Sequence, residues 1–182
     1  MINTYKLKLT ILQQEILRFL FINAGTAFNA RALAKGLDVS QPAISKALPA
    51  LEQNSYIKVK KDKESKRLSI ELNRDNPLVT GLKRSENIKM FYESGLPEYL
   101  SDNFPGCTII LFGSYSRGED TKESDIDIAA IGTKGKELEL EKFEKMLKKK
   151  IIIQFYCDFK EINKHLKENL FNGILIKGGM EL

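Results

Sequence analysis

The sequence predicts an α+β fold in two consecutive parts, and three observations support this prediction. Apolar residues recur at helical spacing as far as about residue 54, which is typical of amphipathic helices. Residues 56–60 and 67–72 then alternate between apolar and polar, as the two strands of a hairpin do. Three further segments of strand length predict a small mixed sheet flanked by helices: 107–112, 125–131 and 151–159.

The composition fits a protein with packed cores and gives no sign of a membrane segment. The chain has 182 residues, of which 42% are hydrophobic, enough for one medium domain or two small ones. No apolar run approaches the roughly 18 residues that a membrane helix requires, and residues 1–20 lack the pattern of a signal peptide. We therefore expect a cytoplasmic protein, with Cys107 and Cys157 as reduced thiols.

The positive charge is concentrated at the start of the chain. Residues 1–75 hold 13 Lys and Arg against 7 Asp and Glu, whereas residues 76–182 hold 16 against 17. The excess of positive charge therefore lies entirely in the first part, which indicates a polyanionic partner for that part.

The first part reads as three helices that are separated by turns. Residues 8–23 form an amphipathic pattern, Asn29 is a suitable N-cap for a short helix over 30–37, and Ser40 is a suitable N-cap for a helix over 41–54. The spacing places Ile44, Ala47, Leu48 and Leu51 of the third helix in the core, and Gln41, Ser45 and Lys46 on its outer face. Pro49 is expected to kink the second half of this helix.

The hairpin that follows carries a strongly basic tip. Two acidic residues, Asp62 and Glu64, oppose six basic ones there. The basic residues are Lys58, Lys60, Lys61, Lys63, Lys66 and Arg67.

Together, the three helices and the basic hairpin resemble the winged helix-turn-helix regulators of the MarR and ArsR type, over about residues 8–73. The resemblance implies binding to double-stranded DNA. Gln41, Ser45 and Lys46 would then lie at base edges, and the six basic hairpin residues would lie at phosphates. A homodimer is expected, because winged helices usually read paired half-sites. A protein-docking or dimerisation role for this domain stays open.

The segment over residues 76–105 is expected to join the two parts. Residues 74–81 are polar and contain Pro77, so they read as a linker or helix entry, and helices are predicted over 82–94 and 96–104. Four aromatic side chains of this segment are expected in the core: Phe91, Tyr92, Tyr99 and Phe104.

Residues 106–182 contain a strand, a Gly-Ser turn and a second strand that begins with two carboxylates. Asp125 and Asp127 share one face of the second strand because side chains alternate, and two residues of strand advance roughly 6.6 Å. Mg²⁺ prefers one or two carboxylates together with phosphate oxygens and water. Gly113 allows a phosphate to approach the backbone, while Ser114 supplies a hydroxyl group and an N–H group to it.

The stretch from Gly113 to Ile128, "GSYSRGEDTKESDIDI", resembles the motif of the DNA polymerase β nucleotidyltransferase superfamily, in particular its minimal nucleotidyltransferases. The resemblance covers about residues 86–182. It implies that Gly113 and Ser114, with Arg117 nearby, bind the triphosphate of ATP or another NTP. It also implies that Asp125 and Asp127 bind Mg²⁺ and that an NMP group is transferred to a hydroxyl acceptor. Some such proteins are antitoxins that modify a HEPN-type toxin, whereas others modify small molecules or RNA ends.

The superfamily usually takes a third carboxylate from the next core strand, and this sequence lacks it at the expected place. That strand, over 151–159, follows a helix expected over 136–150, whose three final lysines suit the C-terminus of a helix. In the strand, the expected position falls near Gln154, which is not an acid. Asp158 has the same strand parity and is the candidate third catalytic acid, but it lies about 13 Å further along a straight strand. It could instead cap the helix that follows. His165, the single histidine, is expected on the surface.

Two functional interpretations therefore stay open. The chain is either a DNA-binding, Mg²⁺-dependent nucleotidyltransferase, or a transcriptional regulator whose inactive nucleotidyltransferase-like domain senses a nucleotide or mediates assembly. Both predict the same organisation: a DNA-binding domain over 1–75, a joining segment over 76–105 and a minimal nucleotidyltransferase domain over 106–182.

Overall fold

The computed structural model describes residues 9–61 and 68–179, which form two compact units. The first unit ends at Val79 and the second begins at Thr80. Within the described ranges, no helix combines the length and the apolar character needed to cross a membrane.

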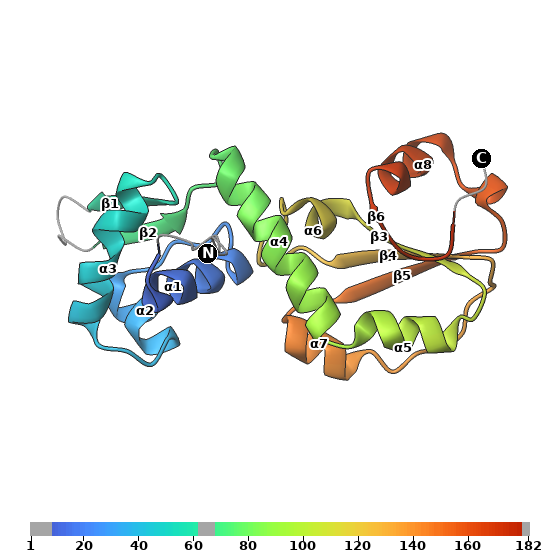
Figure 1. Ribbon diagram of the computed structural model, residues 1–182, viewed down its shortest axis with the longest axis horizontal. Helices are drawn as coiled ribbons and strands as arrows, with labels where there is room; N and C mark the ends of the chain where they lie inside the picture. The colour runs from blue at the N-terminus through green and yellow to red at the C-terminus, as the bar shows by residue number, and fades with distance from the viewer. Residues whose placement is uncertain (1–8, 62–67, 180–182) are drawn as a thin grey trace, which may run out of the picture. The chain divides into compact units, whose positions relative to one another are not determined.

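The first unit begins with three helices, as the sequence predicts: α1 (Ile11–Ile22), α2 (Ala30–Gly36) and α3 (Gln41–Gln53) (Figure 1). Each starts at a side-chain cap. Thr10 and Gln13 form a reciprocal capping box at α1, and the Asn29 side chain accepts a hydrogen bond from the Ala32 amide at 2.8 Å. Such caps satisfy amide groups that have no partner inside the helix.

A two-stranded hairpin completes the winged-helix fold of this unit. The strands β1 (Ile57–Lys61) and β2 (Leu68–Leu72) pair antiparallel. A short bridge between Phe28 and Ile70 ties β2 to the segment before α2. The predicted core face of α3 is confirmed, because Ile44, Ala47, Leu48 and Leu51 are buried. The helix α3 continues through Pro49 to its last residue.

The joining segment is helical over most of its length. Of the two alternatives for its first residues, a linker or a helix entry, the structure has the helix entry: α4 (Pro77–Glu93) begins with Pro77 at the first helical position, where a missing N–H costs little. Asn76 accepts a hydrogen bond from the Leu78 amide at 3.0 Å and so supports this start. The helix α5 (Leu96–Asn103) follows as predicted.

The second unit is built on a four-stranded mixed sheet in the order β5-β4-β3-β6. The strand β4 pairs parallel with β5, whereas β3 pairs antiparallel with β4 and β6. The strands are β3 (Thr108–Phe112), β4 (Ile126–Ile131), β5 (Ile151–Tyr156) and β6 (Ile174–Lys177). The remaining elements are α6 (Gly113–Arg117), α7 (Glu141–Leu147), the 3-10 helix η1 (Phe159–Glu161) and α8 (Lys164–Phe171).

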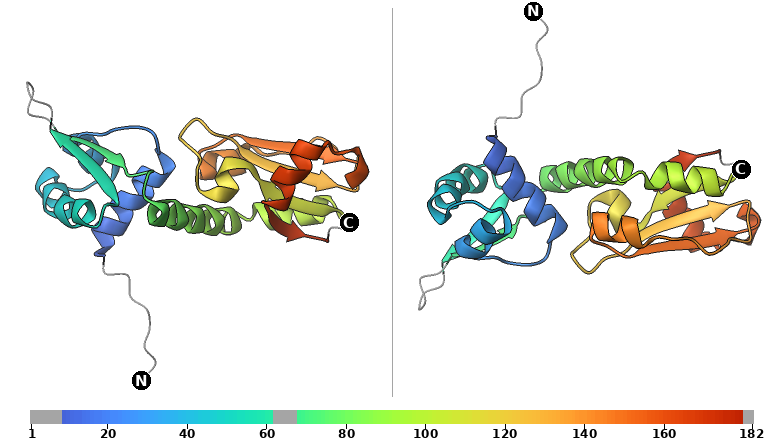
Figure 2. Two further views of the ribbon diagram at one scale, coloured as in Figure 1. Left: turned by 90° about the horizontal axis from the view of Figure 1, so that it is seen from above. Right: turned by 90° about the horizontal axis from the view of Figure 1, so that it is seen from below.

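Helices cover both faces of this sheet (Figures 1 and 2). The helices α4, α5 and α7 lie against the face that presents Ile126 and Ile128, while η1 and α8 cover the face of Ala129 and Ile131. The face covered by α8 is the one that also carries Asp127, because side chains alternate along β4.

Two sequence predictions in this unit are wrong. The helix expected over 136–150 is confined to α7, because Leu138 and Leu140 alternate at period two and pack on the core from a segment without regular structure. Tyr92 was expected in the core but is 45% exposed, whereas its neighbour Phe91 is fully buried on the inner side of α4.

Candidate functional site

The site begins where β3 ends and β4 starts. Phe112, the last residue of β3, pairs with Asp127 of β4. The Gly-Ser turn and the acid pair therefore come together at one end of the two central strands. Gly113 has a φ of +75°, and a Cβ at this position would lie 2.3 Å from the Asp127 Oδ2 atom. Only glycine allows the backbone to approach the carboxylate this closely in this conformation.

Asp125 and Asp127 stand in the alternating arrangement that the sequence predicts. Between and after them, Ile126 and Ile128 are fully buried, whereas both aspartates are partly exposed. Burial, together with the negative charge of Asp125, raises the pKa of the Asp127 carboxyl above its ordinary value, and the charge of Arg117 opposes this rise. The pair thus carries like charges close together at a half-buried position.

Ser114 and Arg117 lie on α6, the short helix that Gly113 opens. Both side chains are partly exposed. Arg117 donates a hydrogen bond to the Glu119 carboxylate at 2.8 Å, so an anionic ligand would have to compete with this surface ion pair. Such exposed pairs contribute little, roughly 0–1 kcal/mol, and can be exchanged for a ligand at small cost.

The acid pair fits a cation that receives its remaining ligands from phosphate and water. Across residues 9–61 and 68–179, no three His, Cys, Asp or Glu side chains are grouped to hold a metal. Two carboxylates are nevertheless sufficient for Mg²⁺ when a bound nucleotide supplies phosphate oxygens. The like charges that raise the pKa of Asp127 are what a divalent cation would neutralise.

The neighbouring strand β5 presents neutral side chains to the acid pair. Ile152 lies directly across the parallel ladder from Asp127 and is 42% exposed. Gln154 lies across from Ala129, two residues further along the same face. Its Oε1 atom accepts a hydrogen bond from the Tyr156 hydroxyl at 2.7 Å. At the positions nearest to the pair, this strand therefore carries an alkyl group and an amide in place of an acid.

The structure does not bring Asp158 to the acid pair. The strands β4 and β5 are parallel, and Asp127 lies near the beginning of their ladder. Asp158 follows the last residue of β5 and so lies at the opposite end of these strands. There its carboxylate caps η1 by accepting a hydrogen bond from the Lys160 amide at 2.8 Å. His165 is exposed on α8.

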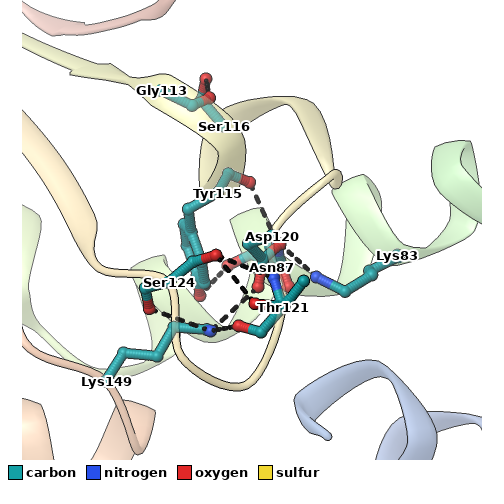
Figure 3. Close-up of polar contacts among 9 residues, drawn as sticks. All are labelled: Lys83, Asn87, Gly113, Tyr115, Ser116, Asp120, Thr121, Ser124 and Lys149. Carbon is teal, nitrogen blue, oxygen red and sulfur yellow. Dashed lines mark hydrogen bonds and ion pairs between the residues drawn. The ribbon is translucent and has the colours of Figure 1, made fainter. Parts of the chain in front are cut away.

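A buried polar cluster next to the site was missed by the sequence reasoning (Figure 3). Asp120 is 1% exposed and lies between two lysines, Lys83 of α4 and Lys149, which precedes β5. The Asn87 amide also donates to this carboxylate, at 2.7 Å. We had assigned Lys149 to a cationic helix terminus, because nothing in its local sequence indicates a buried partner 29 residues earlier.

The outer face of α3 is exposed as predicted. Gln41, Ser45 and Lys46 are all accessible, although the Ser45 hydroxyl donates to the Gln41 carbonyl at 3.1 Å. On the hairpin, Lys61 is exposed, Lys60 lies 3.6 Å from Glu71, and Lys58 pairs with Asp75. Lys63, Lys66 and Arg67 lie outside the described residues.

Comparison with known proteins identifies the kind of domain that the second unit contains. Residues 94–176 match the family model of the nucleotidyltransferase domain, so the chain carries a nucleotidyltransferase domain C-terminal to its winged helix. A search of curated proteins returned no match.

Solved structures that match over part of the chain are repressors and regulators. The adhesin competence repressor AdcR of Streptococcus pyogenes is 24% identical over 53% of this chain and 69% of its own, with a TM-score of 0.41. A ZitR mutant of Lactococcus lactis is 22% identical over 56% and 66%, with a TM-score of 0.39. A MepR–DNA complex of S. aureus is 21% identical over 52% and 81%, with a TM-score of 0.35. These scores are low, so the winged-helix assignment depends on the helices and the hairpin described above.

Proposed function

We propose that the chain is a Mg²⁺-dependent nucleotidyltransferase that transfers an NMP group from an NTP to a hydroxyl acceptor. One observation carries the proposal: the Gly113 backbone lies so close to the Asp127 carboxylate, which neighbours Asp125, that a Cβ at this position would be 2.3 Å from Oδ2. A turn without a side chain, next to two repelling acids, suits a metal-bound triphosphate.

Each residue has a distinct role in this proposal. Asp125 and Asp127 hold Mg²⁺, Gly113 leaves room for phosphate at the backbone, and Ser114 and Arg117 bind phosphate oxygens. The metal would supply positive charge to the reacting phosphoryl group. The chain positions the nucleotide so that the acceptor oxygen and the leaving pyrophosphate can lie in line.

A second candidate function is supported by β5. Ile152 and Gln154 provide no carboxylate that could activate an acceptor, and Asp158 lies beyond the far end of β5. A domain with these features can bind a nucleotide without turning it over. The chain would then be a DNA-binding regulator that senses a nucleotide. A HEPN-type toxin, an RNA end and a small molecule stay candidate acceptors if transfer occurs.

The two candidates are separated by calorimetry and by a transfer assay. We expect ATP or another NTP to bind wild-type protein in the presence of Mg²⁺, and Asp125→Asn to lose this binding. Release of pyrophosphate above the level of Asp125→Asn, with protein, RNA or small-molecule acceptors supplied, would establish the enzyme. NTP binding that changes the affinity for duplex DNA, without such release, would establish the sensor. Failure of all four NTPs to bind would contradict both.

We also propose that the winged helix binds double-stranded DNA as a homodimer, through the exposed face of α3 and the basic hairpin. The single variants Lys46→Glu and Lys61→Glu should each weaken binding to duplex DNA and reduce its salt dependence. Lys164→Glu, on α8 of the second unit, makes the same charge change at an exposed position and should leave binding unchanged. An equal loss in Lys164→Glu would show a nonspecific effect of net charge.

A further inference from the structure

The loop over residues 118–125 connects α6 to β4 and ends at Asp125, so its conformation decides where this carboxylate lies. The loop has no helix or strand of its own. Its internal hydrogen bonds join only Thr121 and Ser124: the Thr121 amide donates to the Ser124 hydroxyl oxygen at 2.9 Å, the Ser124 amide donates to the Thr121 carbonyl at 3.2 Å, and the two hydroxyl groups are 3.2 Å apart. A loop this sparsely bonded needs an external support to hold one geometry.

Lys149 supplies such a support from beneath the loop (Figure 3). Its Nζ atom donates to the Thr121 carbonyl at 2.5 Å and to the Ser124 carbonyl at 3.2 Å. The same atom lies 3.1 Å from the Asp120 Oδ2 atom. The ammonium group thus meets three oxygens of one loop: two carbonyl oxygens accept hydrogen bonds from it, and the Asp120 carboxylate forms an ion pair with it.

Burial makes this contact geometrically demanding. The Lys149 side chain is 3% exposed, and a buried ammonium group is tolerated only where oxygens replace its hydration. Moving the loop would remove those oxygens and leave the charge unpaired. The main chain beside it is tied in as well, because the Ile126 amide donates to the Lys150 carbonyl at 2.8 Å. The Lys149 side chain therefore holds the loop up to Ser124, and the main chain of Lys150 holds it after Asp125.

We propose that Lys149 is a positioning residue of the nucleotide site, which holds the loop over 118–125 so that Asp125 stands beside Asp127. This inference rests on the proposed function of the acid pair. Lys149 itself touches loop carbonyls and Asp120, and it acts on a metal or nucleotide only through the loop. Its removal should therefore weaken cation binding in a protein that is still folded.

The test compares Lys149→Met with Lys150→Met. The control residue is adjacent and has the same chemistry, but its ammonium group is exposed and pairs with Glu144 at 2.9 Å. Two readouts are made on the full chain. Hydrogen exchange reports on amides 119–126, and Mn²⁺ titration followed by electron paramagnetic resonance reports on the affinity of the acid pair.

We expect Lys149→Met to speed exchange in the loop and to lower Mn²⁺ affinity by about 10-fold or more, as the loss of an outer-shell partner does at metal sites. Lys150→Met should change that affinity by less than about 2-fold. Faster loop exchange with unchanged Mn²⁺ affinity would overturn the proposal, because Lys149 would then only support the fold. Unchanged loop exchange would overturn it too.

A milder variant keeps the test decisive if Lys149→Met does not fold. Ser124→Ala removes the hydroxyl contacts with Thr121 from a half-exposed loop position but leaves Lys149 intact. We expect faster loop exchange and a Mn²⁺ affinity lowered by roughly 2- to 5-fold, within the lower part of the range for outer-shell changes. No effect on affinity would contradict positioning by the loop. Absence of Mn²⁺ binding in wild-type protein would refute the proposed function itself, which separates the two failures.

Discussion

Two groups of aspartates in the second unit lie a few residues apart and have opposite surroundings. Asp120 is buried between Lys83 and Lys149 and accepts a further hydrogen bond from Asn87. Asp125 and Asp127, at the beginning of the central strand β4, are half-buried, and their negative charges repel each other. Within one loop and one strand, the chain thus neutralises one carboxylate fully and leaves two in mutual repulsion.

This difference in surroundings distinguishes a carboxylate that stabilises the fold from carboxylates that are available for function. A buried charge without a partner is strongly destabilising, so burial of the Asp120 carboxylate requires its ion pairs with Lys83 and Lys149. The repulsion between Asp125 and Asp127 instead lowers stability and can be relieved by a cation from solution. Acids that are left in mutual repulsion in this way are candidates for function, because nothing in the fold explains them.

The largest effect is expected at Asp120. Asp120→Ala leaves two buried lysines without their carboxylate and should lower the unfolding free energy of the second unit by about 3–5 kcal/mol. Glu119→Gln, which alters the neighbouring exposed pair with Arg117, should cost less than about 1 kcal/mol. Urea unfolding followed by circular dichroism measures both. Equal losses would contradict the distinction between the two kinds of carboxylate.

A smaller loss is expected at Gly113. Gly113→Ala places a Cβ 2.3 Å from the Asp127 carboxylate at a φ of +75°, which should cost about 1–3 kcal/mol and abolish Mg²⁺-dependent ATP binding. Gly81→Ala is the matched control, because its Cβ meets no atom within 4 Å and it lies inside α4. That change should stabilise the chain by about 0.5–1 kcal/mol. Retained ATP binding in Gly113→Ala would contradict the close approach of phosphate at this turn.

Removing the repulsion should stabilise the metal-free protein. Asp127→Asn deletes the carboxylate whose pKa is raised by burial and by Asp125, and we expect a melting temperature higher by roughly 2–5 °C at neutral pH in EDTA. The folded protein binds this proton more readily than the unfolded chain, so the penalty is present above the raised pKa. The advantage of Asp127→Asn should therefore shrink as the pH falls through that pKa. A melting temperature lower than that of wild type would contradict the repulsion.

The smallest effect is expected on β5. Gln154→Glu adds a carboxylate on the face of Asp127 and should lower metal-free stability by less than about 1 kcal/mol while it strengthens Mg²⁺ binding. Gln154→Leu also removes the hydrogen bond from Tyr156 but adds no charge, so it should leave Mg²⁺ binding unchanged. Calorimetric titration compares the two. Equal Mg²⁺ affinities would show that this position lies out of reach of the cation.

Much of this architecture could be predicted from local sequence. Alternation and capping signals located all three helices of the winged helix, and the strands β3 and β4 that adjoin Gly113 and Asp125 and carry Asp127. These signals are visible in the sequence because they depend on neighbours in the chain. The start of α4 was left open between a linker and a helix entry, since Pro77 favours one as readily as the other.

Features that depend on distant residues could not be predicted. Lys149 and Asp120 are 29 positions apart, and the ladder that places Ile152 across from Asp127 depends on the register of β5. Strand parity correctly put Gln154 on the face of Asp127, but parity alone does not show that Asp158 follows the strand end and caps η1.

The most direct test of the acid pair is the melting temperature of the wild-type second unit, within the full chain, as a function of Mg²⁺ with ATP present. Since a ligand that binds only the folded state stabilises it, we expect the melting temperature to rise with Mg²⁺ concentration for wild type and to stay constant for Asp127→Asn. Equal increases in melting temperature for both proteins would mean that Mg²⁺ and ATP bind elsewhere. The assigned role of Asp125 and Asp127 would then be wrong.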